Sequence, residues 1–145
     1  AVEVKTTHGK NHQKIHISSE RQLDTEIIPF IYLYHLSLDV RSGNGETLNE
    51  LVDSMGTLLK GNVTAANTFK MKLLEAAYYE HHKYLYEDMG YTIRQENFYH
   101  VTGDFPRITE RQIPKGVGDV KYSVVLTESE SWRLKEADVL KRLAL

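Results

Sequence analysis

Two short stretches near the start of the chain alternate between positions of different polarity. From Val2 to Thr7 the even-numbered positions form one face, while Glu3 and Lys5 project from the other. Side chains two residues apart on a strand point the same way, so this pattern predicts a strand. A polar turn follows, and the pattern at 14–17 predicts a second strand.

Helix starts are indicated by a Ser or Thr followed three residues later by Glu or Gln, the spacing of a capping box. It occurs at Ser19/Gln22, Thr47/Glu50 and Thr127/Glu130. We therefore expect helices from each of these positions, and a further long helix from Thr64 to Asp88 on the spacing of its apolar residues.

The strongest strand signal covers residues 30–40, where apolar side chains occupy both faces. A strand that is apolar on both faces belongs in the middle of a sheet. A hairpin or pair of strands is expected at 91–101 and another strand at 120–126. The order of elements predicts a single α/β domain over 1–145, of mixed topology, with a central mixed sheet flanked by helices.

Composition narrows the classes of function only a little. The 145 residues contain 41% hydrophobic and 26% charged residues, which is typical of a globular chain. The absence of cysteine excludes disulfides, thiolate catalysis and cysteine-bound zinc. No apolar run is long enough for a membrane span, and a cytoplasmic protein is expected. The net charge of −2 neither supports nor excludes a DNA-cleaving protein.

Glu3 and Lys5 are the first candidate site residues, because their spacing suits phosphodiester hydrolysis. A carboxylate and the carbonyl of the intervening Val4 are oxygen donors of the kind that Mg²⁺ prefers. The neighbouring ammonium can position the attacking water and offset charge on a pentavalent phosphorus.

Spacing alone does not single out this pair. The chain contains a second acidic-x-Lys match at Asp119 and Lys121, and two matches are about what chance predicts from its 20 acidic residues. Asp104 precedes the second pair at a distance that suits the first acid of a two-part motif. Either pair is also explained as a solvated ion pair on an exposed strand.

The sequence around Glu3 and Lys5, and much of the rest of the chain, resembles the bacterial PD-(D/E)xK motif proteins of the restriction-endonuclease-like superfamily, which occur beside restriction and other anti-phage genes. The similarity is carried by the runs VEVKTT at 2–7, HISSERQL at 16–23, FY at 98–99, DFPRI at 104–108, IPKGV at 113–117 and VKYS at 120–123.

This resemblance implies a restriction-endonuclease-like core that cleaves DNA with Mg²⁺, with Glu3 as the acidic ligand and Lys5 as the lysine. The family's first acidic residue lies on a strand before this pair, where the sequence has only Ala1 and Val2. We therefore expect an N-terminally truncated core, the C-terminal part of a longer protein, that is inactive alone. Partners in a restriction or defence system and a homodimer are left open.

Further candidates surround this pair. Gln22 is either a catalytic residue facing the metal or only a helix cap. Ser19 and Arg21 would meet DNA phosphate at a helix N-terminus. Lys10 and Lys14 would contact the DNA backbone, although solvated surface is the default explanation for both lysines.

Three interpretations follow. The first is a Mg²⁺-dependent DNA endonuclease acting in restriction or anti-phage defence. The second is a non-catalytic DNA-binding or assembly module on the same scaffold. The third is a small structural domain without a role on nucleic acid.

Overall fold

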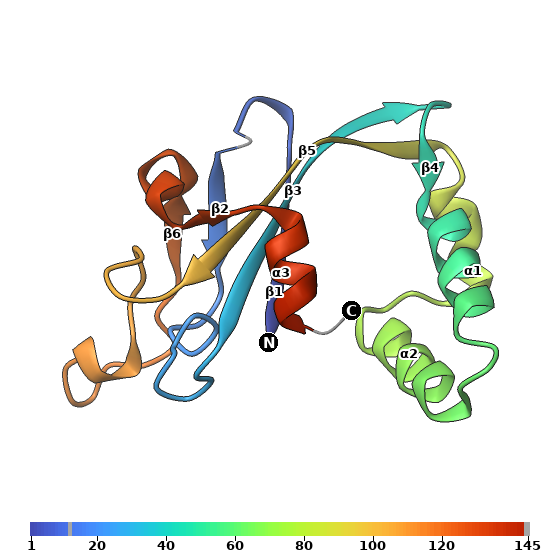
Figure 1. Cartoon of the computed structure of the whole chain (residues 1–145). Helices are drawn as coiled ribbons and strands as arrows, with labels where there is room; N and C mark the ends of the chain where they lie inside the picture. Colours follow the sequence, from blue (N-terminus) through green and yellow to red (C-terminus); the bar gives the residue numbers. More distant parts are fainter. Residues whose placement is uncertain (12, 144–145) are drawn as a thin grey trace. The chain divides into compact units, whose positions relative to one another are not determined.

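The computed structural model describes residues 1–11 and 13–143, which pack as two compact units (Figure 1). Unit 1 comprises Ala1–Leu38 and Ile93–Leu145, and unit 2 comprises Asp39–Thr92. Strands β3 (Ile31–Ser42) and β5 (Met89–Val101) carry the chain from one unit into the other. The expectation that 1–145 form a single domain stays a prediction.

The main sheet contains both parallel and antiparallel pairs. Its order is β1-β3-β5-β4, and β7 (Arg133–Leu134) also pairs with β5. β1 (Val2–His8) runs parallel to β3, whereas β7 runs antiparallel to β5. The predicted central position of the strand at 30–40 is confirmed, because β3 lies between β1 and β5.

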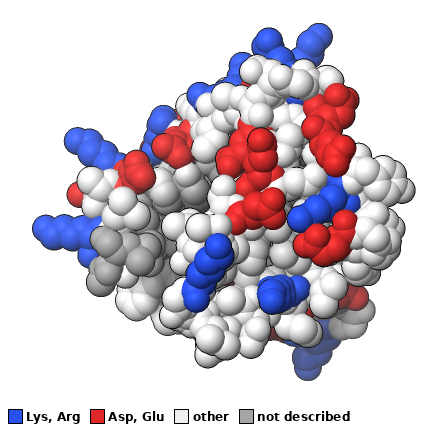
Figure 2. Space-filling view, turned by 90° about the vertical axis from the view of Figure 1, so that its right-hand side faces the viewer, with Lys and Arg blue, Asp and Glu red and all other residues white. Residues whose placement is uncertain are grey.

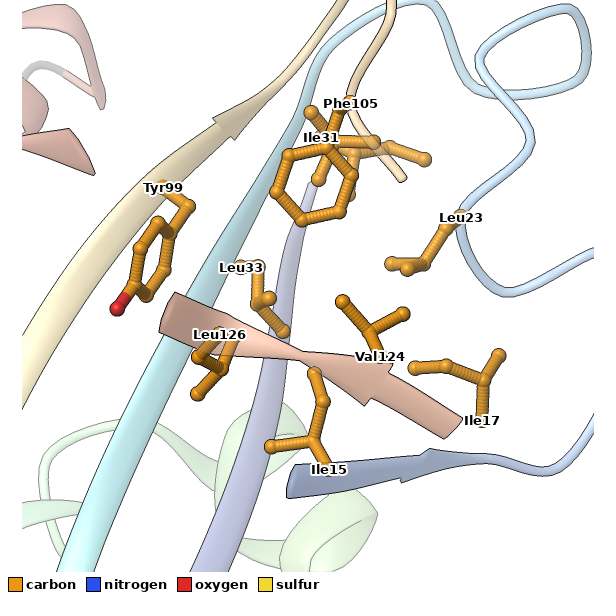
Figure 3. Close-up of a cluster of buried hydrophobic side chains, with 10 residues drawn as sticks. Ile15, Ile17, Leu23, Ile31, Leu33, Tyr99, Phe105, Val124 and Leu126 are labelled. Carbon is orange, nitrogen blue, oxygen red and sulfur yellow. The ribbon is translucent and has the colours of Figure 1, made fainter. Parts of the chain in front are cut away.

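A second, two-stranded sheet covers one face of the main sheet in unit 1. β2 (Lys14–Ile17) and β6 (Tyr122–Val125) pair antiparallel. Their inward side chains meet those of β3 and β5 in the principal core, which Figure 3 shows. Its buried members are Ile15, Ile17, Leu23, Ile31, Leu33, Tyr99, Val101, Phe105, Val124 and Leu126.

Helix α3 (Glu136–Leu143) packs on the other face of β3 and β5. Val139 of this helix is fully buried against Tyr32 and Phe98, which alternate with the residues of the principal core. The ring of Phe98 is stacked on that of Tyr34 at a centroid distance of 4.2 Å. These layers confirm the predicted α/β class with a mixed central sheet flanked by helices.

Two predicted elements of unit 1 are wrong. The segment from Ser19 onward forms successive turns rather than a helix, and Leu23 is its buried apolar anchor. The stretch from Thr127 belongs to a 3₁₀ helix, η4 (Leu126–Trp132), and the α-helix starts only after β7. Two further short 3₁₀ helices are η1 (Gly9–Asn11) and η3 (Glu110–Gln112).

Unit 2 is mainly helical. α1 (Leu48–Leu58) follows β4 (Glu46–Thr47) and begins with the predicted capping box, in which the Thr47 and Glu50 side chains bond to each other's backbone N–H. The prediction of one long helix from Thr64 to Asp88 is wrong. Helix α2 (Val63–Glu75) ends at Glu75, and a separate 3₁₀ helix, η2 (Glu80–Tyr86), follows it. The expected hairpin at 91–101 is instead part of one strand, β5.

The end of α2 is formed by a Schellman motif with alanine in the position that usually holds glycine. Ala77 adopts a left-handed backbone with φ 58°. Its N–H bonds to the carbonyl of Leu74, and the Tyr78 N–H bonds to that of Leu73. These are the two hydrogen bonds of the motif. They stop the helix although both Ala76 and Ala77 have high helix propensity.

Unit 2 buries few of its own apolar side chains. Tyr78 is its one buried large hydrophobic residue among those described, and neither α1 nor α2 has a buried residue. Figure 2 shows acidic and basic groups interspersed on the face in view. Among the described residues, no helix combines the length and apolar character of a membrane span.

Candidate active site on strand β1

Strand β1 presents Glu3 and Lys5 on the side of the sheet that β2 and β6 cover. Its parallel register pairs Glu3 with Leu33, a residue of the principal core, and Lys5 with His35. Both charged side chains lie at the margin of that layer, with 28% of the Glu3 side chain and 15% of the Lys5 side chain exposed. A half-covered position of this kind lowers the mobility of a side chain while leaving its polar end accessible to solvent.

The ammonium of Lys5 is held from two sides. Its Nζ lies 3.0 Å from Glu3 Oε1 and donates a 2.9 Å hydrogen bond to Gln22 Oε1. The same amide oxygen accepts a 3.1 Å bond from the backbone N–H of Ser18. The structure thus brings together all three residues that were predicted to be catalytic.

Gln22 reaches Lys5 from a turn and not from a helix. The expected capping box at Ser19 is absent, since Ser19 Oγ accepts from the Arg21 N–H and the Gln22 side chain bonds one residue earlier, at Ser18. Gln22 is therefore not a helix cap, and its catalytic role stays a prediction.

Two buried carboxylates hold the segment that carries Gln22. Asp24, which is 1% exposed, accepts hydrogen bonds from the N–H groups of Glu26 and Glu110 at 2.9 and 3.0 Å. Glu20 accepts a 3.0 Å bond from the Val120 N–H. The sequence analysis did not identify these anchors. Asp24 could have been predicted to form an Asx turn, in which an Asp side chain accepts a hydrogen bond from the N–H two residues later.

Close to Lys5, strands β1 and β3 are also joined by a buried polar contact. The Thr7 hydroxyl and His35 Nε2 lie 2.8 Å apart, and both residues are at least 90% buried. Hydrogen bonds in a poorly hydrated interior are strong enough to fix the strands on either side. The contact therefore helps to hold β1 against β3 at the level of Lys5.

A groove runs along β1 from Lys5 and has a volume of ≈ 470 Å³. Its lining consists of Val4, Lys5, Thr6, Thr7, His8, Lys14 and His16. Four of these seven side chains are lysines or histidines and none is acidic. Lys14, predicted to contact DNA, thus lies in the same groove as Lys5, and the sequence analysis did not assign His8 or His16 to the site.

The other predicted DNA contacts lie elsewhere. Lys10 is an exposed residue of η1. Ser19 and Arg21 line a separate hollow of ≈ 430 Å³ together with residues 113–119. Arg21 forms a 3.0 Å ion pair with Glu110. Because no helix starts at Ser19, the expected helix N-terminus is wrong, and contact of these three residues with DNA stays a prediction.

The competing pair, Asp119 and Lys121, is not arranged on a strand. Both precede β6, and Asp119 has a left-handed backbone with φ 54°. No hydrogen bond or ion pair joins them among the described residues. Asp104 lies in the turn after β5. The side-by-side geometry that the motif needs is therefore present at Glu3 and Lys5 and not at the second pair.

The oxygen donors predicted for a divalent metal at this site are the Glu3 carboxylate and the Val4 carbonyl. Across residues 1–11 and 13–143, no three His, Asp or Glu side chains form a group that would hold a metal ion by themselves. Mg²⁺ is commonly bound through one or two carboxylates, with water and substrate phosphates in its other positions. The donors at β1 fit an ion bound in this second way.

Comparison with family models gives one match. Residues 1–127 match the model of the family described as "Putative PD-(D/E)XK family member, (DUF4420)". The matched residues include β1, the segment that carries Gln22 and the groove. Comparison with curated proteins and with solved structures gives no match.

Proposed function

Because this chain belongs to that PD-(D/E)XK family and has a nuclease-like scaffold, we propose that it is part of a Mg²⁺-dependent DNA endonuclease whose catalytic residues include Glu3, Lys5 and Gln22. The observation that carries the proposal is the Lys5 ammonium, held between a carboxylate at 3.0 Å and an amide oxygen at 2.9 Å on the rim of a basic groove.

Lys5 is the residue that acts on the reacting phosphate. Its ammonium offsets the negative charge that develops on phosphorus and orients a water for attack on the phosphodiester. The 2.9 Å bond to Gln22 restricts the rotation of the long lysine side chain, so that the charge is in place before the substrate arrives.

Gln22 has a second contribution in this proposal. Both of its hydrogen bonds end on Oε1. Among the described residues no hydrogen bond involves its Nε2, so the amide N–H groups are left to donate to the water or to a phosphate oxygen. Glu3 and the Val4 carbonyl would hold Mg²⁺, and the ion supplies Lewis-acid stabilisation of the phosphate when it is bound.

The test is the nicking of supercoiled plasmid, with Mg²⁺, by the protein in its natural full length. Lys5→Met should reduce the rate by at least about a hundredfold, the usual cost of losing a charged group that stabilises a transition state. Lys121→Met should leave the rate unchanged, and Lys60→Met is a matched control outside the groove. An active Lys5→Met protein would overturn the proposal, and an inactive Lys121→Met protein would move it to the second pair.

We propose that the DNA cut in this way is foreign, as expected for restriction or anti-phage defence. The support is the resemblance to proteins that occur beside such genes. Expression in a susceptible bacterium should lower phage plaque numbers, and the Lys5→Met protein should not. Equal plaque numbers with both proteins would remove the defence role without affecting the chemistry.

A DNA-binding or assembly module without cleavage is the second candidate. It is favoured by the lack of a self-sufficient group of metal ligands in the described part of the chain. This candidate predicts salt-dependent DNA binding by both the wild-type and the Lys5→Met protein, together with no cleavage by either.

A further inference from the structure

The exposed face of β2 presents two potential phosphate contacts in a row. Lys14 and His16 are exposed, whereas Ile15 and Ile17, which alternate with them, are buried in the principal core. Positions two apart on a strand are separated by roughly 6.5 Å. This separation is comparable to that of neighbouring phosphates along one nucleic-acid strand.

Both side chains line the groove that begins at Lys5. No acidic side chain lines it, and the described residues provide no ion-pair partner for Lys14. A lysine without an ion-pair partner can bind an anionic ligand without first giving up a carboxylate. The groove thus leads from a free lysine on β2 to the ammonium of the candidate active site.

His16 is oriented by a residue that lies 107 positions away in the sequence. Its Nδ1 lies 3.0 Å from the hydroxyl oxygen of Ser123, its partner in the antiparallel pair of β2 and β6. When the Ser123 hydroxyl donates to Nδ1, the ring proton of a neutral imidazole must reside on Nε2. That tautomer presents an N–H donor without needing a positive charge.

We propose that Lys14 and His16 bind successive phosphates of one DNA strand and lead it to Lys5, with Ser123 fixing His16 as a neutral donor. The inference rests on the proposed function, which it deepens by assigning the entry path of the strand. Lys14 contributes charge, His16 contributes a directed hydrogen bond, and Ser123 is a positioning residue that acts through His16.

The two contacts differ in how they respond to salt, and this difference provides the test. Binding of a short labelled DNA duplex by the full chain is followed by fluorescence anisotropy over a range of salt concentrations, without divalent metal. The assay is run at about pH 8. Lys14→Gln should reduce the slope of log K against log salt by about 0.9, the value for one phosphate contact.

His16→Ala should weaken binding about five- to tenfold and leave this slope unchanged, because a neutral donor displaces no counterion. Ser123→Ala should weaken binding in the same direction. The variant that combines His16→Ala with Ser123→Ala should bind DNA no more weakly than His16→Ala alone, since Ser123 acts only through His16. Nitrogen NMR of His16 should show the Nε2–H form in the wild type and a mixture of tautomers in Ser123→Ala.

Lys60→Gln and His81→Ala, which lie outside the groove, are the matched controls for loss of a charge and of an imidazole. Thermal unfolding of every variant separates loss of binding from loss of fold. Wild-type binding with unchanged slope in Lys14→Gln and unchanged affinity in His16→Ala would overturn the inference and leave the proposed cleavage intact. Absence of DNA binding by the wild type would also overturn the inference. The proposed function is tested separately, by plasmid nicking.

Discussion

Lys5 Nζ and Gln22 Oε1 are joined by a 2.9 Å hydrogen bond although 17 positions separate the two residues in the chain. Because the same oxygen accepts from the Ser18 N–H, the lysine is tied to the backbone of the following segment through a single amide. Gln22 therefore connects Lys5 on β1 to the turns that follow Ser18, and these turns help to fix the position of the ammonium.

Gln22→Leu keeps the size of the side chain and removes its hydrogen bonds. We expect kcat for DNA cleavage by the natural full-length protein to fall about tenfold with little change in KM, because the ammonium loses its alignment rather than its charge. Steady-state nicking kinetics measure both values. Wild-type kcat in this variant would show that the brace has no part in the reaction.

The 145-residue chain on its own should not cleave plasmid DNA in Mg²⁺. The reason is the small donor set at β1, where Glu3 is the one carboxylate among the described residues that forms an ion pair with Lys5 and no group of three metal ligands is present. An agarose-gel assay at high protein concentration checks the expectation. Mg²⁺-dependent cleavage that disappears in Lys5→Ala would contradict it.

Ala77→Gly should stabilise the chain by about 1 kcal/mol, because a left-handed backbone is strained for alanine and unstrained for glycine. Urea unfolding gives the free energy of unfolding. Ala66→Gly, inside α2, is the matched control and should cost about 1 kcal/mol. A loss of stability in both variants would mean that the left-handed turn at the helix end is not formed.

Asp24→Ala should reduce the free energy of unfolding by about 3 kcal/mol, since it leaves the Glu26 and Glu110 N–H groups without an acceptor. Glu26→Ala, which replaces an exposed residue in the same turn, should change stability little. Equal effects of the two substitutions in urea unfolding would argue against the buried anchor.

Tyr34 should make the fold sensitive to alkali. Burial and a 2.6 Å hydrogen bond to Glu96 raise the pKa of its phenol from 10.0 to about 12. Between these values the unfolded chain releases the proton and the folded chain retains it, so stability is fully present below pH 10 and falls as the pH rises towards 12. In Tyr34→Phe this part of the decline should be absent from thermal unfolding curves.

The strands could be predicted from the sequence because their signal is local. β1 and β2 have the expected bounds to within one residue, since alternation and burial agree at Val2–His8 and Lys14–Ile17. The Glu3 and Lys5 pair follows from the same alternation. Nothing in that alternation distinguishes it from Asp119 and Lys121, which only the resemblance and the fold separate.

The turns around Gln22 could not be predicted because distant partners decide them. Ser19 and Gln22 have capping-box spacing, but Asp24 and Glu20 are drawn inward by the N–H groups of Glu110 and Val120. Contacts across about 80 to 100 positions of sequence override a local preference for helix. The contact between His16 and Ser123 could not be predicted for the same reason, since the two residues meet only when β2 pairs with β6.

Unit 2 begins within β3, at Asp39, and ends within β5, at Thr92, so it connects two strands that are neighbours in the sheet. In evolutionary terms it occupies the place of a loop between adjacent strands, where changes in length are tolerated best. Glu3, Lys5, Gln22 and the groove all belong to unit 1. A change of chain length between these two strands should therefore leave the residues of the candidate site in place.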